Sequence, residues 1–396
     1  MASFDVVIVG GGPIGSTVAR LLAQNGASTC VIERKEEIGF PSHCSGLVSR
    51  DFIDLGAVPE HLILNRIMGG TVYSFDTASY TFKNDIAYAY VIDRTGYDQF
   101  AYRMALSKGA KYILNSRIKS FERRKDCLRI FIDNNEDFID TRIVVIATGG
   151  SFSVKKLFAF NEKPTEDIKT IQVETDFKTD NPHLVYIYMN NNIAHNWFSW
   201  VIPINGDRAR IGLGTDRNEN LLELFHRLCN EWDLLKGATI YASKRVIWHI
   251  PIGLARESIK DNVILVGDAA FQVKPFSGGG LYTGTLSAFF ASEVILKALE
   301  KNDFSRNTLK EYERLWHPVI GREIERERTL RDIYTTITDI DKSEIIKELN
   351  RINVTKILTT YGRIDEPWRA GFPLILRTGK IVARYIGRKF QKLFKR

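Results

Sequence analysis

The hydrophobic pattern at the start of the chain predicts a strand, a glycine-rich turn, a helix and a second strand. Phe4–Val9 is a short run rich in β-branched residues, as expected of a buried strand. The turn covers Gly10–Gly15, the helix covers Ser16–Asn25 and the second strand covers Ser28–Ile32. This order is that of a βαβ unit, whose two strands lie in one parallel sheet.

Strands and helices of the same α/β type follow this unit, and they occur again much later in the chain. A helix is expected over Arg94–Lys108, and an apolar strand at Asn262–Val266 precedes a long helix. That helix, Leu281–Leu299, contains too many polar residues for a membrane span. Further strands are expected at Ala110–Leu114, Ser116–Arg123, Leu128–Ile132 and Arg142–Ala147.

Between these two blocks, apolar and polar residues alternate in several runs. Such alternation is typical of an antiparallel sheet with one covered face. Strands are expected at Lys169–Phe177, Leu184–Met189, Trp197–Ile202, Ala209–Gly214 and Arg245–Ile250. From Asn307 onward the chain is helical and charged.

Together these patterns predict an α/β fold with an inserted domain. A discontinuous Rossmann-type domain comprises residues 1–69, 93–168 and 251–305. An antiparallel β-sheet substrate domain comprises residues 70–92 and 169–250, and residues 306–396 form a C-terminal helical region with a basic amphipathic tail.

The most specific motif lies inside the first βαβ unit. Gly10-Gly11-Gly12-Pro13-Ile14-Gly15 has the GxGxxG spacing, and Glu33 follows at the end of the next strand. Gly10 allows the tight turn, Gly12 lets the backbone approach a pyrophosphate, and Gly15 allows close packing of helix and strand. The helix N-terminus favours the phosphate charge, and the Glu33 carboxylate can accept from ribose hydroxyls. The motif therefore predicts a dinucleotide site.

Two later segments indicate FAD rather than NAD. An apolar strand runs into Thr148 and Gly149, and a second strand ends in Gly267 and Asp268 at the mouth of a helix. The turn Gly278–Gly280 can bring backbone N–H groups to the isoalloxazine carbonyls, where negative charge develops on reduction. The discontinuous domain is therefore expected to bind FAD.

Composition and cysteine spacing exclude several other classes of protein. Hydrophobic residues make up 44% of the 396 residues and charged residues 26%, as in ordinary globular proteins. The four cysteines form no CxxC pair and no metal-ligand spacing with the histidines. We therefore expect no metal site, no disulfide framework and a cytoplasmic location.

Beyond these patterns, the chain resembles the geranylgeranyl reductase family of the aromatic-hydroxylase flavoprotein superfamily. The likeness covers most of the chain to about residue 300. The family loop P-x-x-C-G-G is matched at Pro41, Cys44 and Gly46, with Ser45 at the remaining position. The family's Y-x-W-x-F-P motif is matched at Trp200 and Pro203. Phe198 and Ile202 depart from that motif, as Phe198 replaces its Tyr.

The resemblance implies roles for particular residues. Cys44 would lie beside the flavin, and Phe198 and Trp200, two residues apart on one face of a strand, would line a prenyl cavity or pack in the core. Cys44 could deliver or relay a proton, and His43 could tune its pKa or be a loop histidine in contact with solvent. Contacts to FAD are expected from Glu33, Arg34, Cys44, Ser45, Gly46, Arg94, Ile118, Asp268, Pro275 and the glycines already named.

The implied activity is FAD-dependent hydrogenation of isoprenoid double bonds, with archaeal-type membrane lipid precursors as substrates. Hydride would come from flavin N5, and water would have to be excluded from the site. Because the sequence has one GxGxxG motif, the flavin would be reduced by transiently bound NAD(P)H or by a ferredoxin-like redox protein.

The C-terminal tail suggests where such an enzyme would meet its substrate. From Trp368 to Arg396 there are nine Lys or Arg residues and no Asp or Glu. In Phe372–Arg396, apolar residues are interleaved with these charges, so a helix there would be amphipathic. We expect peripheral contact with an anionic membrane surface, or a helix packed on its own protein, and no nucleic-acid binding.

Two other functions fit parts of the same sequence. Phe198–Pro203 also lies close to the W-x-W-x-I-P motif of flavin-dependent halogenases, so a halogenase or monooxygenase is one alternative. The other, of a different class, is a flavin-bearing redox sensor that does not turn over.

Overall fold

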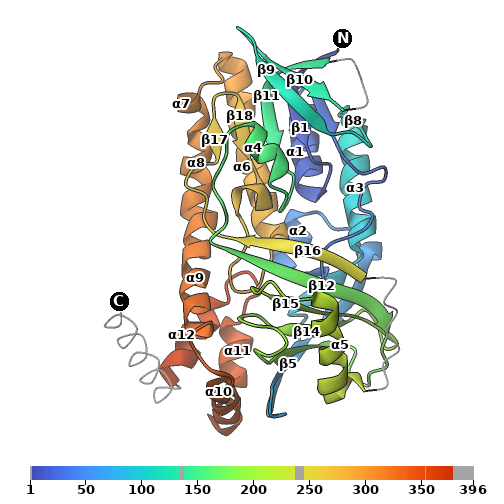
Figure 1. Ribbon diagram of the computed structural model, residues 1–396, viewed down its shortest axis with the longest axis vertical. Helices are drawn as coiled ribbons and strands as arrows, with labels where there is room; N and C mark the ends of the chain where they lie inside the picture. The colour runs from blue at the N-terminus through green and yellow to red at the C-terminus, as the bar shows by residue number, and fades with distance from the viewer. Residues whose placement is uncertain (1, 134–137, 237–244, 353, 378–396) are drawn as a thin grey trace.

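An eight-stranded sheet forms the upper half of the molecule (Figure 1). The computed structural model describes residues 2–133, 138–236, 245–352 and 354–377. The main path of this sheet has the order β17-β18-β11-β1-β2-β8, in which the neighbours from β18 to β8 run parallel. β9 and β10 join β11 as antiparallel strands. The bounds are β1 Ala2–Val9, β2 Thr29–Ile32, β8 Lys111–Ile113, β9 Ile118–Arg123, β10 Leu128–Ile132, β11 Phe138–Ile146, β17 Ile259–Lys260 and β18 Val263–Leu265.

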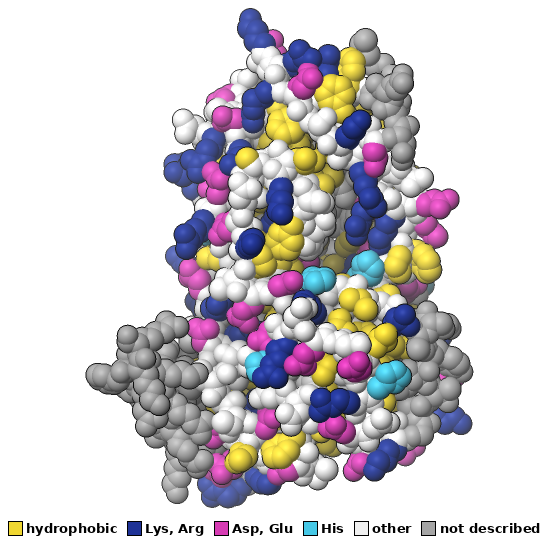
Figure 2. All heavy atoms as spheres, in the orientation of Figure 1, with side chains coloured by type: hydrophobic (Ala, Val, Ile, Leu, Met, Phe, Trp, Pro, Cys, Tyr) yellow, Lys and Arg dark blue, Asp and Glu magenta, His cyan; other side chains and the backbone are white. Residues whose placement is uncertain are grey.

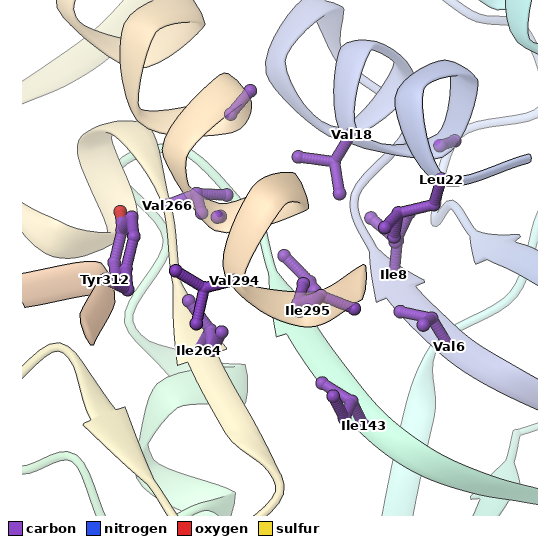
Figure 3. Packing of buried hydrophobic residues seen from close by; sticks show 14 of the residues in the cluster. Val6, Ile8, Val18, Leu22, Ile143, Ile264, Val266, Val294, Ile295 and Tyr312 are labelled. Carbon is purple, nitrogen blue, oxygen red and sulfur yellow. The ribbon is translucent and has the colours of Figure 1, made fainter. Parts of the chain in front are cut away.

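Helices cover this sheet and complete its core. On one face, α1 (Pro13–Gln24) and α6 (Leu281–Lys301) pack against it. Figure 3 shows side chains of both helices meeting those of β1 and β11. Val6 and Ile8 of β1 point to this core, while Val7 and Val9 enter the cluster on the other face. Burial on both faces explains the uninterrupted apolar run at Val6–Val9.

A seven-stranded sheet forms much of the lower half, in the order β16-β12-β15-β14-β13-β5-β6. All its neighbours are antiparallel except β13 and β5. Helix α5 (Leu221–Glu231) packs on one face, and the other face turns towards the upper half. The bounds are β5 Gly69–Ser74, β6 Ser79–Lys83, β12 Glu166–Asp176, β13 Leu184–Met189, β14 Ser199–Pro203, β15 Arg208–Thr215 and β16 Arg245–Ile252.

A small three-stranded sheet lies beside the other two, and the sequence patterns did not predict it. β7 (Ala89–Ile92) pairs with β3 (Leu47–Val48) and β4 (Ile63–Ile67), all antiparallel. Residues of α2 (Arg50–Leu55) and α3 (Arg94–Ser107) pack against it. β7 therefore does not join the seven-stranded sheet, and the predicted domain boundaries stay a prediction.

The described chain from residue 306 to residue 377 is mainly helical, as the sequence predicts. α8 and α9 form a column along one side of both halves, and α10–α12 lie at its lower end (Figure 1). Arg331 of α9 donates to Glu166 of β12 and to the Asn196 carbonyl. The helices are α7 Arg306–Leu309, α8 Glu311–Trp316, α9 Arg322–Tyr334, α10 Asp339–Ile352, α11 Thr355–Tyr361 and α12 Trp368–Arg377.

The expected basic tail, Phe372–Arg396, lies largely outside the described residues. Among the helices that are described, none has the length and apolar character that crossing a bilayer requires. On the face in Figure 2, acidic and basic side chains are interspersed, so the net positive charge is not gathered in one patch there.

Several predicted element starts are wrong. β11 begins at Phe138 and not at Arg142, β12 begins at Glu166 and not at Lys169, and two further starts are wrong for identifiable reasons. The first helix begins at Pro13 and not at Ser16, because proline has the backbone geometry of a first helical position. Trp197 lies in a turn before β14, where its N–H donates to the Ala194 carbonyl at 3.0 Å. The neighbouring Asn196 has a φ of 52°, which is incompatible with a continuous strand.

The close approach of α1 to β1 predicts a cost for any side chain at Gly15. A Cβ there would overlap the Gly10 carbonyl oxygen, which is backbone and has little freedom to move. Gly15→Ala should lower the free energy of unfolding by about 1–3 kcal/mol, measured by urea denaturation. Gly206→Ala is the control, since a Cβ at Gly206 meets no atom within 4 Å, and it should change stability by less than about 0.5 kcal/mol. Equal stability of the two variants would contradict the packing described.

Candidate active site

One cavity of about 1060 Å³ lies between the two large sheets. Its walls come from the loops that follow β1, β2, β11 and β18, and from the face of the seven-stranded sheet opposite α5. Loops at the carboxyl ends of parallel strands are where ligands bind in doubly wound folds. The cavity is thus the candidate site, and it joins a dinucleotide-type loop to an apolar chamber.

The dinucleotide end is built around the N-terminus of α1. No side chain caps this helix, so its first N–H groups are available to an anion. A Cβ on Gly12 would meet no atom within 4 Å, whereas one on Gly10 would overlap the Ala147 carbonyl oxygen. Gly10 has a φ of 107°, which favours glycine. The turn therefore packs against the Ala147 backbone at Gly10 and has free space at Gly12. This free space beside the helix N-terminus suits a pyrophosphate.

Glu33 is placed to orient a ribose at this end. Its Oε2 accepts from the Gly11 N–H at 2.6 Å, and its Oε1 accepts from the Lys35 N–H at 2.9 Å. The side chain is 8% exposed, so both hydrogen bonds are largely shielded from water. The carboxylate is thereby fixed relative to the glycine turn, and its remaining lone pairs can accept from ligand hydroxyls.

Asp268 and the glycines after it form a second wall of the cavity. Asp268 follows β18, and a Cβ on Gly280 would overlap its Oδ1. Burial raises the pKa of Asp268 to about 6, although the charge of Arg94 acts in the opposite direction. The loop between β11 and α4 (Ser153–Leu157) contributes Thr148 and Gly149 to the lining of the same cavity.

The loop that carries Cys44 is held by the seven-stranded sheet. Arg210 of β15 donates to the Ser45 carbonyl at 2.7 Å and to the Ile92 carbonyl at 3.1 Å. Gln172 of β12 donates to the Cys44 carbonyl at 3.3 Å. A Cβ on Gly46 would overlap the Arg210 guanidinium, so the loop and the sheet approach closely only because this residue is glycine.

Arg94 is the charge beside the Cys44 thiol. Its guanidinium interacts with Cys44 and pairs with Asp98, with Nη2 and Oδ1 at 3.0 Å. Arg94 and Asp98 are each 7% exposed, so the pair is nearly dry. Asp93 caps the start of α3 by accepting from the Gly96 N–H, and this places Arg94 at the first helical position.

His43 has a different character from a general acid at neutral pH. Burial, with the nearby charges of Lys35, Arg34 and Arg94, lowers the pKa of His43 to about 4. The imidazole is therefore neutral near pH 7. It therefore adds no positive charge beside Cys44, and the cation next to that thiol is Arg94.

The opposite end of the cavity is apolar and aromatic. Phe198 and Trp200 both line it, with ring centroids 6.1 Å apart, and Trp248 lies 6.3 Å from Trp200. The Trp200 Nε1 donates to Gln172 Oε1 at 3.1 Å, so the one polar atom of the indole has a partner. The apolar ring of Trp200 forms part of the cavity wall. Apart from His249, the residues of the seven-stranded sheet that line the chamber are apolar, namely Phe82, Val185, Ile187, Trp200, Ile202, Trp248 and Ile250.

The structure brings most of the predicted site residues to this one cavity. Those that line it are Gly10, Gly12, Pro13, Ile14, Glu33, Arg34, His43, Cys44, Ser45, Arg94, Ile118, Thr148, Gly149, Phe198, Trp200, Asp268, Gly278, Gly279 and Gly280. Gly15, Gly46 and Pro275 are not in its wall. Both glycines lie behind the wall. Gly15 allows the Gly10 backbone to pack against α1, and Gly46 allows the Arg210 guanidinium to pack against the Cys44 loop.

Sequence reasoning missed several residues that complete the site. Gln172 and Arg210 hold the Cys44 loop, and Lys274 and Asp365 form a buried ion pair at the cavity wall, 2.6 Å between Nζ and Oδ1. Each contacts its partner across a long sequence separation. No local pattern in the sequence marks such contacts.

Comparisons with known proteins agree with this geometry. A family model described as lycopene cyclase protein matches residues 5–372. A digeranylgeranylglycerophospholipid reductase from Methanocaldococcus jannaschii is 32% identical over 324 residues, which cover 79% of this chain and 82% of that protein.

Solved structures share the fold at lower sequence identity. A geranylgeranyl bacteriochlorophyll reductase-like protein from Thermoplasma acidophilum has a TM-score of 0.85 at 22% identity, covering 97% of this chain and 98% of that one. A mutant of the halogenase PltM in complex with FAD has a TM-score of 0.68 at 15% identity, covering 93% and 85%. The chain is 32% identical to the digeranylgeranylglycerophospholipid reductase over most of both proteins, and a family model matches nearly its whole length. The chain therefore belongs to the family of the digeranylgeranylglycerophospholipid reductases.

Proposed function

We propose that this protein is an FAD-dependent oxidoreductase that hydrogenates carbon–carbon double bonds of isoprenoid chains. The observation that carries the proposal is one continuous cavity, whose lining includes the α1 N-terminus, Cys44 and the chamber around Trp200. Its one end suits a dinucleotide and its other end suits a hydrocarbon chain. Relatives named as digeranylgeranylglycerophospholipid reductases support the same assignment.

The residues of the dinucleotide end fit FAD. The α1 N-terminus and Gly12 would hold the pyrophosphate, Glu33 would accept from a ribose, and Asp268 with Gly278–Gly280 would contact the ribityl chain and the isoalloxazine. When bound, the flavin supplies the hydride. The chain itself must orient the double bond, keep water out and provide a proton.

Cys44 is the proposed source of that proton. It lies in the cavity wall, on a loop that Gln172 links to Trp200 of the aromatic chamber. The neighbouring Arg94 guanidinium interacts with this thiol, so a fixed positive charge lies beside the sulfur. Asp268 also lines the cavity and is an acid, but its position after β18 places it with the glycine loop.

The chamber indicates an uncharged, flexible substrate. Aromatic and aliphatic side chains offer contact area to a prenyl chain, and no cation or carboxylate comes from the sheet face that lines it. We propose a geranylgeranyl chain of an archaeal-type lipid precursor, reached by peripheral contact with a membrane. The electron donor would bind transiently, as NAD(P)H or as a small redox protein, because the sequence has one GxGxxG motif.

Oxygen-dependent chemistry is the second candidate, favoured by the motif Phe198–Pro203 and by the halogenase fold relatives. The description of the matching family model adds cyclisation of a prenyl chain as a third possible outcome. These reactions differ in product mass and in their need for oxygen.

One anaerobic experiment separates them. The flavin-loaded protein is reduced with dithionite, mixed with a geranylgeranyl lipid, and followed by flavin absorbance and product mass. The proposal predicts flavin reoxidation with the gain of one hydride and one proton per double bond. Turnover only after air is admitted would contradict it in favour of a monooxygenase or halogenase, and a product of unchanged mass would indicate cyclisation.

Removing the Cys44 thiol should separate proton delivery from flavin binding. Cys44→Ala is expected to bind and reduce flavin normally but to hydrogenate substrate about 10²-fold more slowly or worse, because a general acid contributes about that much. The measurement is single-turnover flavin reoxidation by the lipid. Cys127→Ala, on the loop between β9 and β10, is the control and should react as the wild type does. An undiminished rate in Cys44→Ala would remove the thiol from the mechanism.

Neutralising Glu33 should weaken flavin binding. Glu33→Gln replaces a charged acceptor of two backbone N–H groups, and hydrogen bonds to charged groups are worth about 1.5–3 kcal/mol. We expect the flavin dissociation constant to rise by about tenfold to a hundredfold, measured by fluorescence titration of the apoprotein. Glu37→Gln changes an exposed carboxylate that accepts from Gln99, and it should leave the constant unchanged.

The low pKa of His43 has a consequence for stability. Between pH 6.5 and about 4 the unfolded chain binds a proton at this position and the folded chain does not, so stability falls as the pH falls through this window. His43→Gln should remove part of that fall and leave stability above pH 7 nearly unchanged. Urea midpoints measured across the pH range test this. Identical pH profiles of variant and wild type would show that His43 titrates normally.

A further inference from the structure

Lys274 is a buried cation in the wall of the cavity that the proposed chemistry does not use. It is 3% exposed and lies on the segment between Asp268 and Gly278. Its Nζ donates to Asp365 Oδ1 at 2.6 Å and to the Ile364 carbonyl at 2.9 Å. Both partners come from the C-terminal region, about ninety residues later in the chain. Burial of an ammonium is costly, so its retention calls for a role.

The ammonium lies directly against the glycine loop. A Cβ on Gly279 would come within 3.2 Å of Nζ, so nothing separates the loop backbone from the charge. The Lys274 N–H donates to the Gly279 carbonyl at 3.1 Å, and the Gly278 N–H donates to the Lys274 carbonyl at 2.8 Å. These two hydrogen bonds join the Lys274 backbone to the glycine loop. The position of the Lys274 charge is therefore coupled to the positions of the glycine N–H groups.

A second acid borders this cluster without adding its charge at neutral pH. Glu327 of α9 is fully buried, its Oε2 accepts from the Phe276 N–H at 3.1 Å, and its Oε1 has no protein partner. Burial raises the pKa of Glu327 to about 8, with Lys274 lowering it and Glu323 and Asp365 raising it. Glu327 is therefore mostly protonated at pH 7. Asp365 is then the carboxylate that pairs directly with Lys274.

We propose that Lys274 is the fixed positive charge that makes a flavin seated at Gly278–Gly280 easier to reduce. Reduction places negative charge on the part of the flavin that the glycine N–H groups would face, and a cation behind those groups stabilises it. Asp365 moderates the effect because it is the opposite charge on the same ammonium. Lys274 acts through the loop and is a positioning residue. The inference rests on the proposed function, since it needs a flavin at this loop.

The cluster gives two substitutions with opposite expected effects. Lys274→Met removes the cation and should lower the flavin midpoint potential, whereas Asp365→Asn removes the countercharge and should raise it. We expect each to change the reduction equilibrium by tenfold or more, which is about 30 mV for a two-electron couple. The measurement is an anaerobic titration of the flavin-loaded protein against a reference dye. Lys310→Met, on an exposed position of the C-terminal region, should not shift it.

Lys274→Met leaves Asp365 buried without its partner and could unfold the protein. Asp365→Asn avoids this problem, since the introduced amide oxygen can still accept from Lys274. Glu327→Gln is a close replacement for a protonated carboxyl and is expected to fold. Its potential should equal that of the wild type at pH 7 and exceed it increasingly above pH 8, where only the wild type gains a second negative charge beside Lys274.

The outcomes separate the two hypotheses. Wild-type protein that binds no flavin would contradict the proposed function itself. Flavin that binds while its potential is unmoved in Asp365→Asn at pH 7 and in Glu327→Gln above pH 8 would overturn the role of Lys274 and leave the proposed function standing. Shifts of both variants in the expected directions would support the inference, since a merely structural role moves stability and not potential.

Discussion

The contact between the α1 backbone and the end of β1 is the constraint on which the site depends. Gly15 packs on the Gly10 carbonyl, and Gly10 packs on the Ala147 carbonyl, with no room for a Cβ at either position. This brings the N-terminus of α1 to the carboxyl edge of the sheet, where β11 and β18 also end. Glu33 is then held on the Gly11 N–H, so the anion site and the ribose acceptor share one rigid frame.

The second requirement is that the two large sheets face each other at a fixed distance. Two polar links tie the Cys44 loop to the seven-stranded sheet, namely Gln172 to the Cys44 carbonyl and Arg210 to the Ser45 carbonyl. A third link, Lys274 to Asp365, ties the glycine loop to the C-terminal region. Each link is largely buried, so each is specific in geometry and costly to leave incomplete. Between them they keep an apolar chamber open beside a polar loop. A reductase of an unactivated double bond needs that combination, because the substrate is hydrocarbon and the reaction requires a proton.

Much of the fold follows from local sequence, and the exceptions have physical causes. The run Val6–Val9 and the glycine spacing after it identify the parallel layer, because burial on both faces demands continuous apolar residues. Trp197 looked like strand from its apolar neighbours, but the left-handed Asn196 turns the chain before β14 begins. The small sheet was missed because β3 has only two residues, too few to show a period.

The site was predictable where a motif is contiguous and unpredictable where chemistry is assembled across the chain. Gly12, Glu33 and Cys44 stand in recognisable sequence surroundings, and the structure lines one cavity with them. Lys274 is a lone charge in an apolar segment, and its partner Asp365 lies 91 residues away. Gln172 of β12 joins Trp200 to the Cys44 loop. The alternation of apolar and polar residues along β12 predicts which face of the sheet Gln172 lies on, but not its partners.

If flavin and hydrocarbon chain occupy one continuous cavity, a crystal structure of the protein with FAD and a geranylgeranyl lipid will show both in it. We expect the isoalloxazine between the Cys44 loop and Gly278–Gly280, with the prenyl chain along Phe198 and Trp200 and a double bond in contact with the flavin ring. Flavin bound at this loop with the lipid excluded from the chamber, or flavin bound elsewhere, would contradict this expectation.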